Sequence, residues 1–414
     1  MTEPKTHYPV VIIGAGPAGC ATSTYLSKAR IEHIILDKSS FPRDKVCGDA
    51  MSGKTTYVIK NADERWMKEL MESPSVLPSG GLCFVAPNGK SLAIPFGKKP
   101  DGYAPGFTAT RLFFDNFLFK RLDKKFAKVL SPATLQSLEY AAGIWQLSIE
   151  SEMGVESYSA KMLVAADGDK SIVRKKMGLQ EASPKTSAVG LRAYYSGVTG
   201  MKDNQIELHF LPELIPGYFW IFPLTNGRAN IGAGMLSADV RFKKINLREK
   251  MLEAIAKNPN LKERFAYAKL EGKILGWGLP MGMEKKPISG DGYLLTGDAA
   301  QLIDPFSGEG IGNAMYSGMK AAQAIEAALA AHTFDKAFFA KAYDEPMYSR
   351  LWGELQTSTV LQRLCRFPWL FNFVINKANK SPTLKATITG MFTDLDLRSK
   401  LRQPSFYLKM IFNR

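Results

Sequence analysis

A glycine-rich turn near the N-terminus is the first group of residues whose types and spacing could do chemistry. Gly14, Gly16 and Gly19 follow an apolar stretch, with Pro17 and Ala18 between the last two. In such a turn the first glycine permits the tight bend, the second lets backbone approach a pyrophosphate, and the third lets a helix pack closely on the strand. The N-terminus of that helix attracts the anion. The spacing therefore predicts a dinucleotide site.

An acidic residue completes this pattern. Asp37 lies about 20 residues beyond the turn, where a carboxylate can accept hydrogen bonds from ribose hydroxyls, and Lys38 follows it as a further candidate. The elements that must position these residues are a strand over residues 8–13, a helix over 16–30 and a strand over 31–36. We therefore expect a βαβ unit that begins a parallel sheet.

Two later segments indicate that the dinucleotide carries a flavin. The first places Asp167 and Gly168 after an apolar strand. The second contains Gly297 and Asp298 after another strand, and then a glycine-rich helix start with the candidates Pro305, Gly308, Gly310, Ile311 and Gly312. A carboxylate at Asp298 could accept hydrogen bonds from a ribityl chain, and the helix N-terminus could face the ring edge that gains negative charge on reduction. Each segment alone could be an ordinary tight turn, but together with the first turn they predict bound FAD.

These three segments resemble those of a large flavoprotein group that includes the aromatic hydroxylases, squalene epoxidase and flavin-dependent halogenases. Two further stretches make the chain most similar to the geranylgeranyl reductase family within that group. One is residues 41–49, Phe-Pro-Arg-Asp-Lys-Val-Cys-Gly-Asp. The other is Tyr-Phe-Trp-Ile-Phe-Pro at 218–223, followed by Asn-Ile-Gly-Ala-Gly at 230–234. The likeness extends from about residue 10 to about residue 330.

The resemblance implies an FAD-dependent reductase that saturates isolated double bonds of a hydrophobic isoprenoid. NAD(P)H or another reductant would supply the electrons, and there is no second GxGxxG for a separate nicotinamide domain. Tyr218, Trp220 and Phe222 alternate along one predicted strand, so their side chains should lie on one side of it. We expect them to line a substrate slot, with Tyr218 and Trp220 also candidates for catalysis. Plain packing of a sheet on its core is the alternative.

The loop that contains this Cys-Gly-Asp stretch, residues 41–49, adds further candidates. By the resemblance, Cys47 can reach the flavin and could donate a proton or gate flavin movement, with Gly48 and Arg43 beside the cofactor. A small buried apolar role for Cys47 is equally open. Arg111 matches a pyrophosphate contact of the wider group, and an ion pair with Asp115 four residues later is the alternative.

The expected fold is α/β: a Rossmann-like FAD-binding domain with a parallel sheet, an inserted and mostly antiparallel sheet domain for substrate, and a helical C-terminal region. The FAD-binding domain would comprise residues 1–75, 106–180 and 287–335. The substrate domain would comprise 76–105 and 181–286, and the helical region 336–414.

Net charge and its distribution along the chain indicate which kinds of partner the protein could bind. The 414 residues carry a net charge of +15, and residues 361–414 hold ten basic and two acidic residues among many aromatic ones. That mixture favours an anionic membrane surface over nucleic acid, or else a helical cap with a solvated basic face. No apolar run is long enough to span a bilayer and the polar N-terminus is unlike a signal peptide, so we expect a cytoplasmic protein, peripheral on the inner face of the membrane if the tail binds lipid. Four scattered cysteines and four scattered histidines predict no metal site.

Two other functions remain open from the sequence. A monooxygenase on the same scaffold would use the same FAD segments but react with oxygen. A membrane-associated flavoprotein without its own substrate is the other, and nothing in the sequence excludes it.

Overall fold

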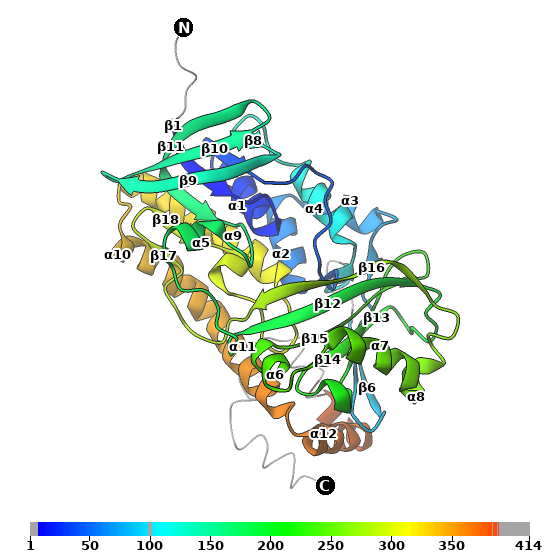
Figure 1. Cartoon of the computed structure of the whole chain (residues 1–414). Helices are drawn as coiled ribbons and strands as arrows, with labels where there is room; N and C mark the ends of the chain where they lie inside the picture. Colours follow the sequence, from blue (N-terminus) through cyan, green and yellow to red (C-terminus); the bar gives the residue numbers. More distant parts are fainter. Residues whose placement is uncertain (1–6, 98–101, 383, 387, 389–414) are drawn as a thin grey trace.

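The computed structural model describes residues 7–97, 102–382, 384–386 and 388, which form two large sheets with helices packed around them (Figure 1). Within the described residues the first sheet contains β1 (His7–Ile13), β2 (His33–Leu36), β8 (Ala127–Leu130), β9 (Ala133–Ala141), β10 (Ile144–Ser151), β11 (Gly154–Ala165), β17 (Ser289–Gly290) and β18 (Tyr293–Leu295). Its central order is β17-β18-β11-β1-β2-β8. The pairs from β18 to β8 are parallel, as expected for strands that are apolar on both faces.

Helices cover this sheet. They are α1 (Pro17–Lys28), α2 (Gly53–Ala62), α3 (Glu64–Glu72), α4 (Arg111–Phe119), α5 (Ile172–Lys176) and α9 (Ile311–Ala331). Small residues let α1 and α9 pack almost backbone to backbone: a Cβ on Gly318 would lie 2.3 Å from the carbonyl oxygen of Ala18. The short 3-10 turn η2 (Gly297–Ala300) leads from β18 toward α9.

The second sheet has the order β16-β12-β15-β14-β13-β5-β6 among the described strands. Its strands are β5 (Gly81–Val85), β6 (Ser91–Pro95), β12 (Ser187–Ser196), β13 (Gln205–His209), β14 (Tyr218–Pro223), β15 (Arg228–Leu236) and β16 (Lys269–Pro280). On one face, Phe219 and Ile221 pack under α7 (Leu247–Lys257) and α8 (Pro259–Lys262). On the other, Trp220 and Phe222 join a separate cluster, so β14 alternates as its sequence predicted.

The C-terminal helices connect the two halves. They are α10 (Lys336–Phe339), a π turn (Ala340–Asp344), α11 (Glu345–Leu364) and α12 (Pro368–Lys380). In Figure 1, α11 runs from the first sheet toward the second, where α12 lies at the opposite end of the molecule from β9. The remaining elements are β3 (Ala50–Met51), β4 (Leu77–Pro78), β7 (Phe107–Thr108), η1 (Pro212–Leu214) and α6 (Ser237–Phe242).

This architecture confirms the expected fold class. We propose that the two sheets are the cores of the two domains inferred from the sequence, since the second sheet takes its strands only from residues 81–95 and 187–280 among those described. Two element lengths differ from what the residue pattern predicts. The pattern of residues 111–126 predicts one helix, but α4 ends at Phe119. The pattern of residues 247–270 also predicts one helix, but the structure has α7, which ends at Lys257, and α8, which ends at Lys262, before β16 begins at Lys269.

Candidate active site

Strand register brings the three predicted FAD segments to one edge of the first sheet. Ile13 pairs with Ala165, and Ala165 pairs with Leu295, so the turns that follow β1, β11 and β18 are neighbours. Ligands of open parallel sheets bind outside these carboxyl ends. Gly14 has φ +101°, and a Cβ there would lie 2.4 Å from the carbonyl oxygen of Ala166. Only glycine permits this turn so close to the second segment.

The first turn presents a helix N-terminus without a side-chain cap. Gly16 is the N-cap of α1, with Pro17 in the first turn and no side-chain hydrogen bond to the cap. Ala18 and Gly19 follow in the buried start of the helix, and Ala18 lies close to Gly297 of the third segment. The amide groups of such an end can hold an anion.

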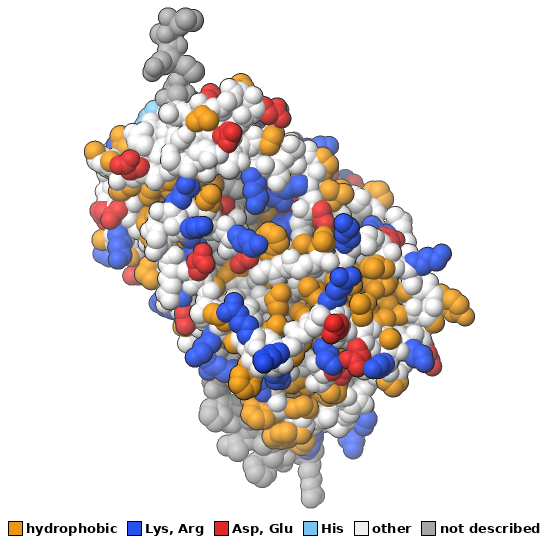
Figure 2. Space-filling model, viewed as in Figure 1, with side chains coloured by type: hydrophobic (Ala, Val, Ile, Leu, Met, Phe, Trp, Pro, Cys, Tyr) orange, Lys and Arg blue, Asp and Glu red, His pale blue; other side chains and the backbone are white. Residues whose placement is uncertain are grey.

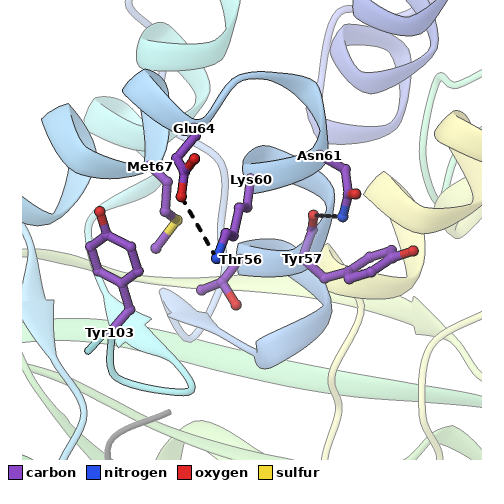
Figure 3. Close-up of a pocket in the computed structure, with 7 residues that line it drawn as sticks. All are labelled: Thr56, Tyr57, Lys60, Asn61, Glu64, Met67 and Tyr103. Atoms are coloured by element: carbon purple, nitrogen blue, oxygen red, sulfur yellow. Dashed lines mark hydrogen bonds and ion pairs between the residues drawn. The ribbon is translucent and has the colours of Figure 1, made fainter. Parts of the chain in front are cut away.

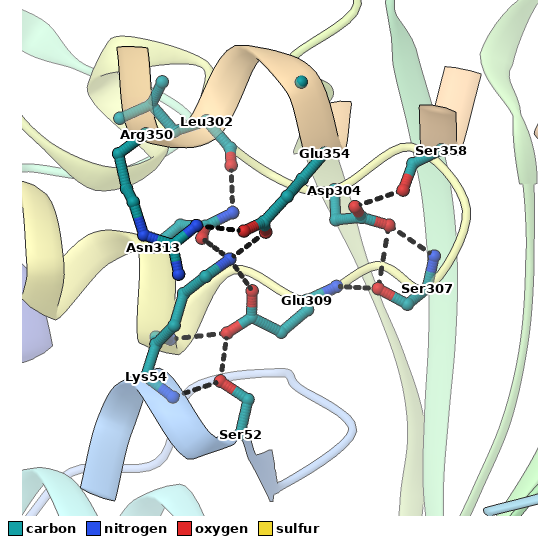
Figure 4. A network of polar contacts seen from close by, with 12 residues as sticks. Ser52, Lys54, Leu302, Asp304, Ser307, Glu309, Asn313, Arg350, Glu354 and Ser358 are labelled. Atoms are coloured by element: carbon teal, nitrogen blue, oxygen red, sulfur yellow. Dashed lines mark hydrogen bonds and ion pairs between the residues drawn. The ribbon is translucent and has the colours of Figure 1, made fainter. Parts of the chain in front are cut away.

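Polar contacts fix the Gly-rich turn before α9 (Figure 4). The Glu309 carboxylate accepts hydrogen bonds from Ser52 Oγ at 2.7 Å and from the Gly312 amide at 3.0 Å. Asp304 accepts from the Ser307 amide and hydroxyl, both at 2.8 Å, and from Ser358 of α11 at 2.5 Å. These acids support the turn that carries Pro305, Gly308, Gly310 and Ile311, while Gly310 caps α9 without a side-chain bond.

Asp37 sits beside the first turn as predicted. Its carboxylate accepts a hydrogen bond from the Ala15 amide at 2.9 Å and pairs with Arg43 at 3.2 Å, whereas Lys38 is exposed. Arg43 also pairs with Asp115 at 3.0 Å.

Arg111 is 3% exposed and forms bonds of 2.6 and 2.7 Å to Asp115. The i,i+4 pair that the sequence left open is therefore present.

An ion pair joins the loop after β2 to the third segment. Lys45 Nζ lies 3.0 Å from Asp298 Oδ2, although 253 residues separate them in sequence. Gly168 of the second segment is also close, since a Cβ on it would be 4.0 Å from Lys45 Nζ. One Asp167 oxygen accepts from the Val173 amide at 3.1 Å, and the other is buried with no hydrogen-bond partner among the described residues. Burial raises the pKa of Asp167.

The two family-like stretches interlock through Asn230. Its amide nitrogen donates to the Cys47 carbonyl at 2.7 Å and to Asp49 Oδ2 at 2.9 Å. Its oxygen accepts from the Trp220 indole at 2.9 Å. Asn230 is fully buried, so each bond is shielded from water. Asn230 was quoted in the sequence motif but not predicted as a site residue, and its role could not be assigned without the contact.

Glycines on neighbouring strands make room for the Trp220 ring. Gly232 stands opposite Trp220 in the β14–β15 register, and a Cβ on it would lie 2.0 Å from the indole. Gly234 and Gly190 also border the ring. The Asn-x-Gly-x-Gly pattern therefore supplies one hydrogen bond and a flat surface for one indole.

The other predicted slot residues contact the cofactor segments. The Tyr218 hydroxyl donates to the Ser307 carbonyl at 2.7 Å, beside Gly308. The Phe222 ring packs on Gly48, where an added Cβ would be 2.8 Å away. Trp220 lies between them, with ring centroids about 6 Å from each. The structure thus brings the three aromatic residues together with the Cys47 loop and the Gly-rich turn.

Asp49 is a site residue that the sequence reasoning missed. It is fully buried and accepts hydrogen bonds from Tyr194 at 2.7 Å, from Asn230, and from the Arg111 amide at 3.2 Å. Burial raises its pKa from 3.8 to about 6, against the lowering effect of these bonds. Its place after Cys-Gly was the only sequence signal.

The raised pKa of Asp49 predicts a pH effect on stability. Because the folded-state pKa lies above the unfolded value, the contribution of Asp49 to stability is greatest below about pH 4 and is lost as pH rises through about 6, by about 3 kcal/mol. Asp49→Asn should remove this loss while keeping an acceptor for Tyr194. We therefore expect the free energy of unfolding of the wild type to fall relative to the variant between pH 4 and 7. Parallel curves in denaturant titrations across that range would contradict the assignment.

A separate pocket of about 390 Å³ lies between α2, α3 and the loop before β7 (Figure 3). It is lined by Thr56, Tyr57, Lys60, Asn61, Glu64, Met67 and Tyr103. Lys60 faces Glu64 at 3.8 Å. None of the residues predicted for FAD or substrate is among this lining.

The family model for the FAD binding domain matches residues 7–62 and 146–337. These ranges contain all three converging turns. The chain belongs to this FAD-binding family. The flavoprotein is an FAD-dependent oxidoreductase, and its turns fit the cofactor: the N-terminus of α1 has no side-chain cap, the Asp37 carboxylate lies beside it, and one buried Asp167 oxygen has no hydrogen-bond partner among the described residues.

Curated relatives carry reductase names. A menaquinone reductase of Mycobacterium tuberculosis is 28% identical over 326 residues, which cover 77% of the flavoprotein and 76% of the relative. A digeranylgeranylglycerophospholipid reductase of Methanococcus vannielii is 27% identical over 371 residues, covering 88% and 89%. The resemblance to the geranylgeranyl reductases is thereby confirmed.

Solved structures share the fold. A geranylgeranyl bacteriochlorophyll reductase-like protein of Thermoplasma acidophilum aligns with TM-score 0.81 at 21% identity, over 96% of the flavoprotein and 99% of that chain. A flavin-dependent brominase aligns with TM-score 0.76 at 18% identity, over 98% and 99%. The same fold thus hosts different flavin enzymes.

Two findings concern metals and membranes. Across residues 7–97 and the described residues from 102 onward, no group of three or more His, Cys, Asp or Glu side chains could hold a metal ion. In the same part of the chain, no helix has the length and apolar character needed to cross a bilayer.

Proposed function

We propose that the flavoprotein saturates isolated carbon–carbon double bonds in a prenyl lipid. The relatives named as reductases support this, and so does the apolar cluster that contains Trp220 and Phe222. The observation that carries the proposal is the Asn230 bridge, which joins Trp220 of an aromatic face to the backbone at Cys47 and to Asp49. An isolated alkene has no polar group that the protein could bind. An apolar aromatic surface held next to the Cys47 loop can position it by close packing.

FAD, when reduced, supplies the hydride for one alkene carbon. The chain then has to hold the cofactor, exclude water and provide a proton for the other carbon. The turns at Gly16 and Gly310 and the carboxylates of Asp37 and Asp298 are the groups that would hold FAD. Trp220 and Phe222, 8% exposed each, would keep water from the reacting bond.

Cys47 is the proposed proton donor. Burial raises the pKa of its thiol, so the sulfur keeps its proton at neutral pH, while Arg111 nearby favours the thiolate left after transfer. Proton transfer breaks the S–H bond and forms the second C–H bond, and water later restores the thiol.

Replacement of Cys47 tests that role. We expect Cys47→Ala to lower turnover about 100-fold, in the range typical of a lost general acid, with flavin content unchanged. Rates should be measured with a prenyl lipid under anaerobic conditions. Cys20→Ala, a buried cysteine on α1, is the matched control. Turnover within threefold of wild type in Cys47→Ala would assign the thiol a packing role only.

The product distinguishes this function from its rivals. After incubation with a prenyl lipid, a reductant and limited air, mass spectrometry should show two added hydrogen atoms per reduced bond. Addition of one oxygen atom would identify a monooxygenase, and an unchanged lipid would favour a flavoprotein without its own substrate.

A further inference from the structure

Three aromatic side chains are exposed at the end of the molecule that carries α6 and α12. Phe242 ends α6 and is 88% exposed, while Phe367 and Trp369 at the start of α12 are 49% and 66% exposed. Figure 2 shows hydrophobic side chains at this end beside Lys and Arg. We call these three residues the aromatic-basic face, together with the basic residues of the same two segments: Arg241, Lys243, Lys244, Arg363, Arg366, Lys377 and Lys380.

An ion pair holds the two parts of this face together. Arg366, next to Phe367, forms bonds of 2.8 and 2.7 Å to the two oxygens of Asp239 in α6. Asp239 is buried, which favours a fixed geometry for the pair. This ion pair therefore holds the connection between α11 and α12 against α6.

The two segments that carry the aromatic residues are strongly basic. Residues 237–244 and 360–380 contain one acid, Asp239, which Arg366 neutralises. Their basic residues are Arg241, Lys243, Lys244, Arg363, Arg366, Lys377 and Lys380. Met153 and Val155, near the turn between β10 and β11, are also exposed. Their charged neighbours in the sequence are acidic: Glu150, Glu152 and Glu156.

We propose that the aromatic-basic face docks on an anionic lipid bilayer. Exposed aromatic side chains can enter the interface while neighbouring cations attract acidic headgroups. The inner side of α12 packs on the apolar cluster that contains Trp220, where the Phe371 and Phe210 ring centroids are 4.2 Å apart. A docked α12 would thus lie between the bilayer and the aromatic cluster, a use that depends on the proposed reaction on a prenyl lipid.

Part of the tail predicted to bind membrane, residues 389–414, lies outside the described residues. The docking surface proposed here does not use it. The full chain is therefore the right material for the test, with the tail kept constant in every variant.

Vesicle flotation tests the docking. The full chain should float with vesicles of phosphatidylcholine and phosphatidylglycerol and remain unbound to phosphatidylcholine alone. The double variant Phe242→Ser/Trp369→Ser should bind at least about tenfold more weakly, because two interfacial anchors are lost. Its matched control is Met153→Ser/Val155→Ser, which should bind like wild type. Equal binding by both double variants, or no binding by the wild type, would overturn the proposal.

Activity on detergent-dispersed prenyl lipid separates this inference from the proposed function. Both double variants should reduce that lipid like wild type, which also shows that they fold. If no protein reduces the lipid, but all three proteins unfold at the same temperature and flotation follows the expected pattern, the proposed reaction fails and the docking surface stands.

Discussion

Gly16→Val should give a folded protein that purifies without FAD. Among the described residues outside its own helix and its chain neighbours, the one atom within 4 Å of a Cβ at Gly16 would be Arg43 Nη2 at 3.6 Å, which is ordinary contact with the end of a flexible side chain. The fold should therefore tolerate valine. The same methyl groups would stand where backbone must approach a pyrophosphate, so we expect FAD affinity to fall at least about 100-fold.

Flavin absorbance of the purified protein and titration with FAD measure this effect, and thermal unfolding reports the fold. Gly97→Val is the control, because a Cβ there would have no atom of the described residues within 4 Å apart from its chain neighbours. A yellow Gly16→Val protein with a full complement of FAD would show that the cofactor does not use this turn.

Asn230→Leu should keep FAD but lose most turnover. The change removes the bonds to the Trp220 indole, the Cys47 carbonyl and Asp49, and leaves buried polar groups without partners. Each such group costs about 1–3 kcal/mol, so stability should also fall. A small displacement of the Cys47 loop relative to Trp220 is enough to lower turnover about 100-fold.

Asn226→Gly provides the matched control on the same hairpin. Asn226 is exposed and has φ +61°, which glycine adopts readily, so this variant should retain activity and stability. Normal turnover in Asn230→Leu with bound FAD would mean that the bridge has no part in positioning the reacting groups.

The cofactor side of the fold was predictable because its signals are local. A Cβ on Gly14 or Gly19 would clash with backbone, and Gly16 fits the predicted close approach of a pyrophosphate. Apolar strands before Asp37, Asp167 and Asp298 indicate a parallel sheet. Alternation along residues 218–223 likewise predicted which side chains share a face.

The contacts between segments could not be read from the sequence. Asn230 and Asp49 are 181 residues apart, and Lys45 and Asp298 are 253 apart, so nothing local shows that they meet. Tyr194 gave no motif at all, yet its hydroxyl bonds to Asp49. The end of α4 was missed for a related reason: residues 120–126 have helical composition but lead into β8, whose pairing with β2 ends the helix early.

An anaerobic single turnover tests the central claim most directly. FAD on the full-length protein would first be reduced chemically, and then a prenyl lipid with isolated double bonds would be added without oxygen. We predict that the oxidised flavin spectrum returns as the lipid loses one double bond per cofactor, while a saturated lipid with the same headgroup has no effect. A flavin that stays reduced with both lipids, and reoxidises only when air is admitted, would contradict the account.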